Sequence, residues 1–139
     1  VICEVVNNHE KHFNRRTELM GAWGEKPYEN DSAADWFAGV FDTVAKKVQE
    51  LLDSPVEELL YPEYRAAAWI LTKIGRTYVY PADVLDDHLS KLHDRLQAMR
   101  NDKDWMDSWV DQDVITKEMD DQILQMQRVC KWNNVVVNF

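Results

Sequence analysis

Apolar residues recur at steps of three and four along much of the chain, which predicts amphipathic α-helices. The strongest stripe lies between residues 31 and 53, and its members are Ala34, Phe37, Phe41, Val44, Val48 and Leu51. Asn30 or Asp31 is placed to cap the start of this helix, and Asp31 and Asp35 lie near the positive end of its dipole. The first long helix is therefore predicted from about residue 31 to residue 53.

Proline and glycine divide the rest of the chain into shorter periodic segments. Further helices are expected over residues 55–60, with Val56, Leu59 and Leu60 as the apolar face, and over residues 62–74, 81–101 and 113–131, with a short amphipathic turn at 105–110. In the last two long helices the inward positions are Leu85, Leu89, Leu92, Leu96, Met99, Ile115, Met119, Ile123, Met126 and Cys130. The predicted fold class is all-α: a single-domain bundle of five or six helices, preceded by an irregular loop that contains Trp and Gly.

Residues 1–19 differ from the rest of the chain in their pattern of apolar and charged residues. They show no sustained period, and their three acidic side chains cancel their three basic ones. One interpretation is that translation starts at Met20 and that residues 1–19 are upstream read-through, since Arg15-Arg16 could be encoded by AGG-AGG, a ribosome-binding element. The other is a flexible tail. We therefore expect three parts: the segment of residues 1–19, a helical domain over residues 20–132, and a short tail over residues 133–139. If Arg15 and Arg16 are encoded by CGN codons instead of AGG, the read-through interpretation loses its main support.

Charge and hydropathy exclude several classes of protein. The formal charge is −9 and the pI is about 4.8, which argues against nucleic acid as a partner. Mean hydropathy is −0.51 and no apolar run approaches the length of a membrane span. The apolar start Val1–Val6 is too short for a secretory signal, so we expect a cytoplasmic protein with reduced thiols, in which Cys130 is a small core residue.

Signals for chemistry are few. The chain lacks the Gly-x-Ser-x-Gly, Walker and Gly-x-Gly-x-x-Gly motifs. His9 and His12 are one residue too close for the zincin spacing, and His88, beside two aspartates, is expected on a solvated face. The aspartates of residues 104–121 lack the Gly and Glu of a calcium loop. We therefore expect no metal site and no cofactor, and we favour a binding role over a catalytic one.

The chain has six tryptophans. Trp36, Trp69 and Trp109 fit core stripes or the edges of those stripes. If they were exposed as a cluster, they would instead indicate a binding surface, because Trp dominates interface hot spots.

The opening of the predicted domain carries a specific motif. It runs Met20-Gly21-Ala22-Trp23-Gly24, then Pro27-Tyr28-Glu29-Asn30-Asp31, then Ala33-Ala34-Asp35-Trp36. This segment resembles the start of the uncharacterised bacterial family called domain of unknown function 4259, and weaker resemblance extends to about residue 131. Lys26 stands where that family usually has a second Gly. The resemblance implies a fold class and no mechanism.

The motif allows two interpretations, and the chain allows two functions. Trp23, Tyr28, Asn30, Asp31 and Asp35 either hold the loop against the first helix or line a pocket or partner surface. The leading hypothesis is a non-catalytic protein-binding module, of immunity or antitoxin type, whose acidic face binds a basic protein. The alternative is a small-ligand binder or enzyme with a pocket around Trp23, Asn30, Asp31 and Asp35. A flat acidic face with exposed aromatic side chains would favour the first, and a deep pocket with converging polar groups the second. The oligomeric state is left open.

Overall fold

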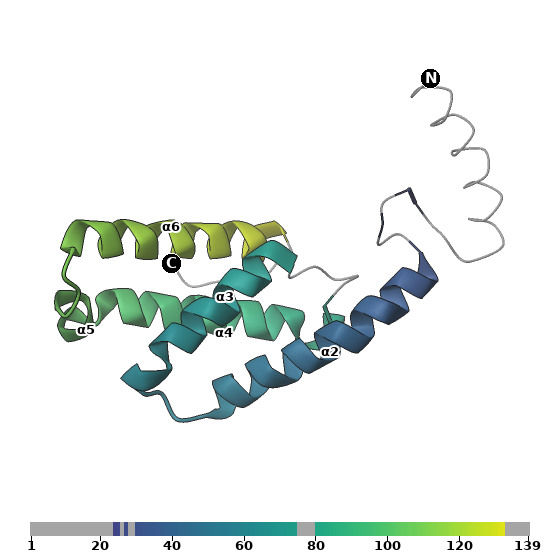
Figure 1. The fold of residues 1–139 in the computed structure, drawn as a ribbon, viewed down its shortest axis with the longest axis horizontal. Coiled ribbons are helices and arrows are strands. Elements are labelled where there is room, and N and C mark those ends of the chain that lie inside the picture. Colours follow the sequence, from purple (N-terminus) through teal and green to yellow (C-terminus); the bar gives the residue numbers. More distant parts are fainter. Residues whose placement is uncertain (1–23, 26, 28–29, 75–79, 133–139) are drawn as a thin grey trace, which may run out of the picture.

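The computed structural model describes residues 24–25, 27, 30–74 and 80–132. Within these ranges the chain forms five α-helices and one 3-10 turn (Figure 1): α2 (Asp31–Asp53), η1 (Glu58–Leu60), α3 (Tyr61–Ile74), α4 (Ala82–Asn101), α5 (Lys103–Asp107) and α6 (Gln112–Trp132). The predicted all-α bundle is confirmed, and the four long helices begin and end within one residue or so of their predicted limits.

Helix α4 is the centre of the bundle. It contacts α2, α3, α5 and α6, and α3 also contacts α6. In Figure 1, α4 and α6 run side by side and α3 crosses them, while α2 runs along the other edge of α3 and α4. The described helices thus pack around a single core.

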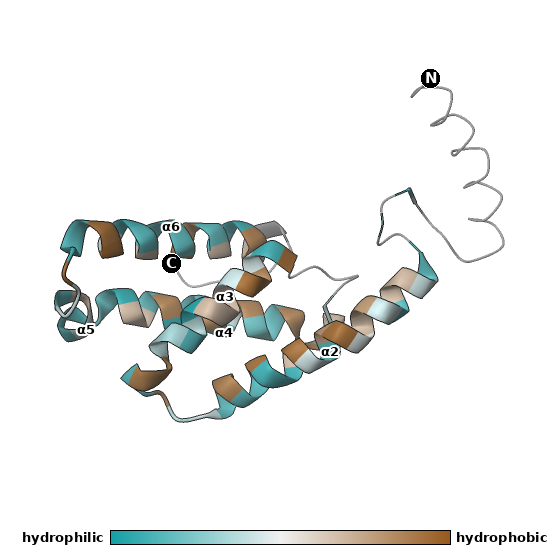
Figure 2. Ribbon diagram, viewed as in Figure 1, coloured by the Kyte–Doolittle hydropathy of each residue, from teal (hydrophilic) through white to brown (hydrophobic). Residues whose placement is uncertain are grey.

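The apolar seams of α4 and α6 form most of that core. Every inward position predicted for these two helices is buried, and the four leucines of α4 have no exposed surface at all. Burial contributes roughly 1.5–3 kcal/mol for each such side chain. Figure 2 shows hydrophilic and hydrophobic residues alternating along both helices, as expected of helices with one apolar face. Cys130 is buried as predicted, and burial raises the pKa of its thiol to about 11, so the thiol is protonated at neutral pH.

Acidic and amide side chains cap three helices. Asn30 Oδ1 accepts a hydrogen bond from the Ala33 amide at 2.8 Å, which confirms the predicted cap of α2. Asp102 and Asp111 act in the same way at the starts of α5 and α6, at 3.1 and 3.0 Å. Each cap satisfies an amide that the helix leaves without a partner. Part of the acidic content therefore stabilises helix ends.

The helix predicted over residues 55–60 is wrong. Only η1 forms there, and a 3-10 turn of three residues is too short to present an apolar face. Leu59 is 85% exposed and Val56 is also exposed, whereas Leu60 packs against the core. Val56 and Leu59 therefore lie on a surface connection between α2 and α3.

His88 does not lie on a solvated face, and that prediction is also wrong. It is fully buried, with Nδ1 2.7 Å from the hydroxyl oxygen of Tyr80 and Nε2 2.8 Å from Oε1 of Gln49 on α2. Because the amide oxygen of Gln49 can only accept, Nε2 carries the proton and Nδ1 accepts from Tyr80. His88 lies three residues after Leu85 and four before Leu92, on the apolar stripe of α4. This spacing indicates burial, whereas the prediction of a solvated face rested on the two aspartates that precede His88 in sequence.

The buried His88 should make stability depend on pH. Burial lowers the pKa of His88 below its usual 6.5, whereas the unfolded chain binds this proton near the usual value. The unfolded state thus takes up more protons as the pH falls below about 6.5, and the free energy of unfolding decreases.

We expect this decrease, measured by urea unfolding between about pH 7 and pH 5, to be smaller in His88→Phe than in the unsubstituted protein. The variant should itself be about 1–3 kcal/mol less stable at pH 7, because Tyr80 and Gln49 lose their partner. An equal pH dependence of stability in the two proteins would show that the lowered pKa of His88 is not the cause of the decrease.

Candidate functional site

The predicted site residues at the start of α2 are only partly described by the structure. Asn30 is used as the cap of α2, and Asp31 and Asp35 are exposed on its first two turns. Trp23, Tyr28 and Lys26 lie outside the described residues. The pocket expected around Trp23, Asn30, Asp31 and Asp35 stays a prediction.

Three tryptophans expected in or beside the core are exposed instead. Trp36, Trp69 and Trp109 have 67%, 56% and 42% of their surface accessible. On α3 the buried stripe is Tyr64, Ala67, Ala68 and Leu71. Trp69 follows Ala68 directly and so lies about 100° around the helix from it, off the stripe. The structure therefore places these three tryptophans on the surface, which is the second of the two alternatives that the sequence left open.

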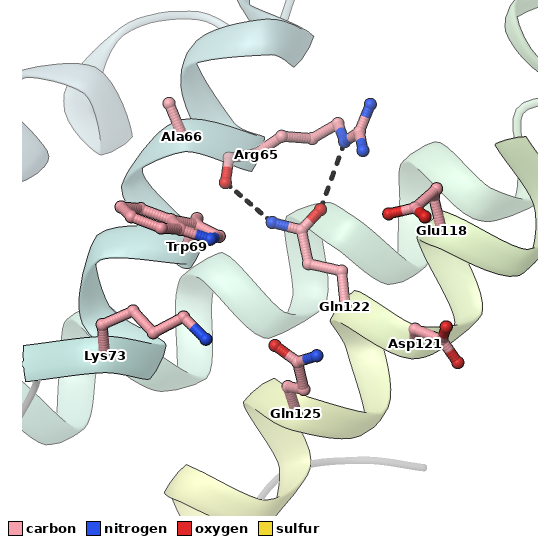
Figure 3. Close-up of a pocket in the computed structure, with 8 residues that line it drawn as sticks. All are labelled: Arg65, Ala66, Trp69, Lys73, Glu118, Asp121, Gln122 and Gln125. Carbon is pink, nitrogen blue, oxygen red and sulfur yellow. Dashed lines mark hydrogen bonds between the residues drawn. The ribbon is translucent and has the colours of Figure 1, made fainter.

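Trp69 lines a groove between α3 and α6, which we call the α3–α6 groove (Figure 3). Its volume is about 340 Å³, and it is lined by Arg65, Ala66, Trp69, Lys73, Glu118, Asp121, Gln122 and Gln125. Arg65, Trp69 and Lys73 are spaced by four, which places them on one face of α3. The α6 residues are spaced by three and four and form the opposite wall.

Gln122 connects the two walls. Its Nε2 donates to the backbone carbonyl of Arg65 at 2.7 Å, and its Oε1 accepts from Arg65 Nε at 3.2 Å (Figure 3). The Arg65 guanidinium also lies 6.0 Å from the centre of the Trp109 ring, so Arg65 joins the groove to Trp109. At the other end, Lys73 Nζ lies 5.9 Å from the centre of the Trp69 ring. Contacts of this kind contribute about 0.5–1 kcal/mol at exposed sites.

The two walls of the groove carry opposite charges. The α3 wall contributes Arg65 and Lys73, and the α6 wall contributes Glu118 and Asp121. Asp121 is already paired with Lys117 on its own helix. Among the described residues, neither Lys73 nor Glu118 forms an ion pair.

An acidic segment lies next to the groove. Residues 102–121 contain eight acidic and two basic side chains, a net charge of −6 (2 − 8). Several of these acids have internal partners: Asp102 and Asp111 are caps, and Asp107, Asp120 and Asp121 pair with Lys103, Arg100 and Lys117. Asp104, Asp113 and Glu118 form no ion pair within the described part of the chain. Trp109, Val110 and Val114 are exposed among them.

Asp102 shows how strongly one of these acids is held by the fold. The backbone amide of Trp105, followed by the Tyr61 hydroxyl at 2.8 Å, lowers the pKa of Asp102. Burial, and then this same hydrogen bond, raises the pKa of Tyr61 to about 12. Both groups therefore keep their ordinary protonation states at neutral pH, and Asp102 is a structural anion rather than a proton donor.

Metal-binding and membrane-spanning features are both missing from the part of the chain that the structure describes. Its residues include no group of three or more His, Cys, Asp or Glu side chains placed to hold a metal ion. None of its helices combines the length and apolar character needed to cross a membrane.

These features define a small all-α domain with an open, charged, tryptophan-lined groove. Residues 21–127 match the family described as "Domain of unknown function (DUF4259)", and the chain belongs to that family. No curated protein and no solved structure matches the chain. The family resemblance expected from the opening motif is thereby confirmed for most of the chain.

We expect Gln122→Ala to weaken the contact between α3 and α6. The substitution removes two hydrogen bonds, each of which contributes about 0.5–1.5 kcal/mol, and the loss should appear as a lower free energy of unfolding in urea. Gln125→Ala is the matched control, since Gln125 is exposed in the same groove and should change stability by less than about 0.5 kcal/mol. Equal effects of the two substitutions would show that the Gln122 bridge does not hold the walls together.

Proposed function

We propose that this protein is a non-catalytic protein-binding module that uses the surface formed by the α3–α6 groove and the neighbouring Trp109. The observation that carries the proposal is the exposure of Trp69, one helical turn after Arg65, and of Trp109, whose ring centre lies 6.0 Å from the Arg65 guanidinium, beside a segment of net charge −6. Tryptophan and arginine are the residue types most enriched at the energetic centres of protein interfaces. A surface that exposes them has apolar area to bury against a partner.

Charge points to the kind of partner. The chain carries −9 overall, and acids without an ion pair in the described chain, such as Asp104 and Asp113, lie near Trp109 in sequence. A negative field raises the rate at which a basic protein docks and suppresses binding of acidic proteins. A basic protein is therefore the preferred partner, and an immunity or antitoxin role against a basic toxin fits this size and charge. A gene for such a protein beside this one would support that role.

The small-ligand or enzyme alternative around Trp23, Asn30, Asp31 and Asp35 has less support. Asn30 already uses its side-chain oxygen to cap α2. The α3–α6 groove contains none of these four residues. We therefore place the binding surface on α3 and α6 rather than at the start of α2.

The proposal predicts a partner whose capture depends on two particular tryptophans. The tagged protein should retain a basic protein from native lysate at low salt and release it as salt is raised, because screening weakens charge attraction. The double variant Trp69→Ala/Trp109→Ala should bind the partner at least about tenfold more weakly, which corresponds to about 1.4 kcal/mol of binding free energy.

Trp36→Ala is the control, because Trp36 is at least as exposed but lies on α2. It should retain the partner. If the double variant and the control capture equally, or if the retained protein is acidic and insensitive to salt, the proposal is wrong.

A further inference from the structure

We propose that the α3–α6 groove binds a polypeptide segment of the partner that carries one acidic and one basic side chain on the same face. The acidic side chain would lie against Lys73 and the basic one against Glu118, with the apolar part of the segment on Trp69. This inference rests on the proposed function, and it specifies the chemistry of the segment that the groove takes.

The first support is the direction of the charged side chains. Lys73 extends from the α3 wall and Glu118 from the α6 wall, and Figure 3 shows both reaching toward the space between the helices. The exposed ring of Trp69 lies on the α3 side of that space. A bound segment would therefore meet a cation and an aromatic ring on the α3 side and an anion on the α6 side.

The second support is that Lys73 and Glu118 do not pair with each other in the described structure. Gln122 joins the walls through a backbone carbonyl and the Nε of Arg65, so the bridge between the helices is an uncharged amide. The pairing of Asp121 with Lys117 lies within α6. Lys73 and Glu118 form no ion pair with a described residue, and a ligand that supplies both signs can pair with each of them.

The third support is the balance of charge and size. The lining has two basic and two acidic side chains and hence no net charge. A segment of one sign would gain from one wall and be repelled by the other, and like-charge contacts oppose binding. The volume of about 340 Å³ lies at the lower end of the range for ligand pockets. It suits a few side chains of a segment, while Trp109 and the acidic residues nearby contact the rest of the partner.

The test uses three short capped alanine-based peptides as probes. They differ only at two positions one helical turn apart, which are Glu and Lys, Lys and Lys, or Glu and Glu. Binding is followed by the indole N–H resonance of Trp69, which is assigned by its loss in Trp69→Phe. The ionic strength is about 0.15 M, so that charges more than roughly 8 Å away are screened and the overall negative charge does not decide the result.

The peptide with both charges should bind at least about threefold more tightly than either of the others. Lys73→Glu and Glu118→Lys should each weaken its binding about fivefold, and the double variant Lys73→Glu/Glu118→Lys should restore it to within about twofold, because a short peptide can bind in the reverse direction. Glu63→Lys is the control: Glu63 is exposed on α3 outside the groove, and this substitution changes the net charge as much as Glu118→Lys does.

Tightest binding of the doubly basic peptide, no recovery in the double variant, or no shift of the Trp69 resonance would each overturn this inference. Each of those results leaves the proposed function standing if capture of the basic protein still depends on Trp69 and Trp109. Loss of that dependence overturns the proposed function as well. All charge variants change exposed side chains, and thermal unfolding followed by circular dichroism confirms that they are folded.

Discussion

The burial of one side of α4 against its neighbours is the constraint on which the structure depends. Its leucine seam is fully buried, and α4 packs against all four of the other described α-helices, α2, α3, α5 and α6. Once α4 is covered, the remaining helices have their apolar stripes turned inward, and only their outer faces are left for solvent or partners. The α3–α6 groove forms where two such outer faces meet. The α3–α6 groove therefore follows from the way α3 and α6 pack next to each other on α4.

Periodicity predicted the part of the fold that depends on one helix at a time. The limits of α2, α3, α4 and α6 and the inward residues of α4 and α6 are set by apolar residues three and four positions apart. It did not predict contacts between helices. Gln122 meets Arg65 across 57 positions of sequence, and His88 meets Gln49 across 39. Nothing in the local pattern around either residue specifies its partner, because that depends on how the helices cross.

The exposed tryptophans illustrate a second limit. Trp69 stands beside three alanines, and two of these carry the buried stripe of α3, so a rotation of about 100° separates a core position from a surface one. Composition alone favours placing such a large apolar side chain inside. The same reasoning misplaced Leu59, which is exposed on a three-residue turn where only Leu60 packs against the core. The size and hydrophobicity of these side chains predicted burial, but their positions around the helix or turn place them on the surface.

The buried thiol of Cys130 can report local opening of the bundle. It has no exposed surface, lies in the α6 seam that packs on α4, and carries a pKa of about 11. The thiolate is the reactive form of cysteine, and the buried thiol is out of reach of a reagent, so alkylation of Cys130 requires at least the last turn of α6 to open. The rate at which an alkylating reagent modifies Cys130 therefore measures how often the C-terminal end of α6 opens from the core.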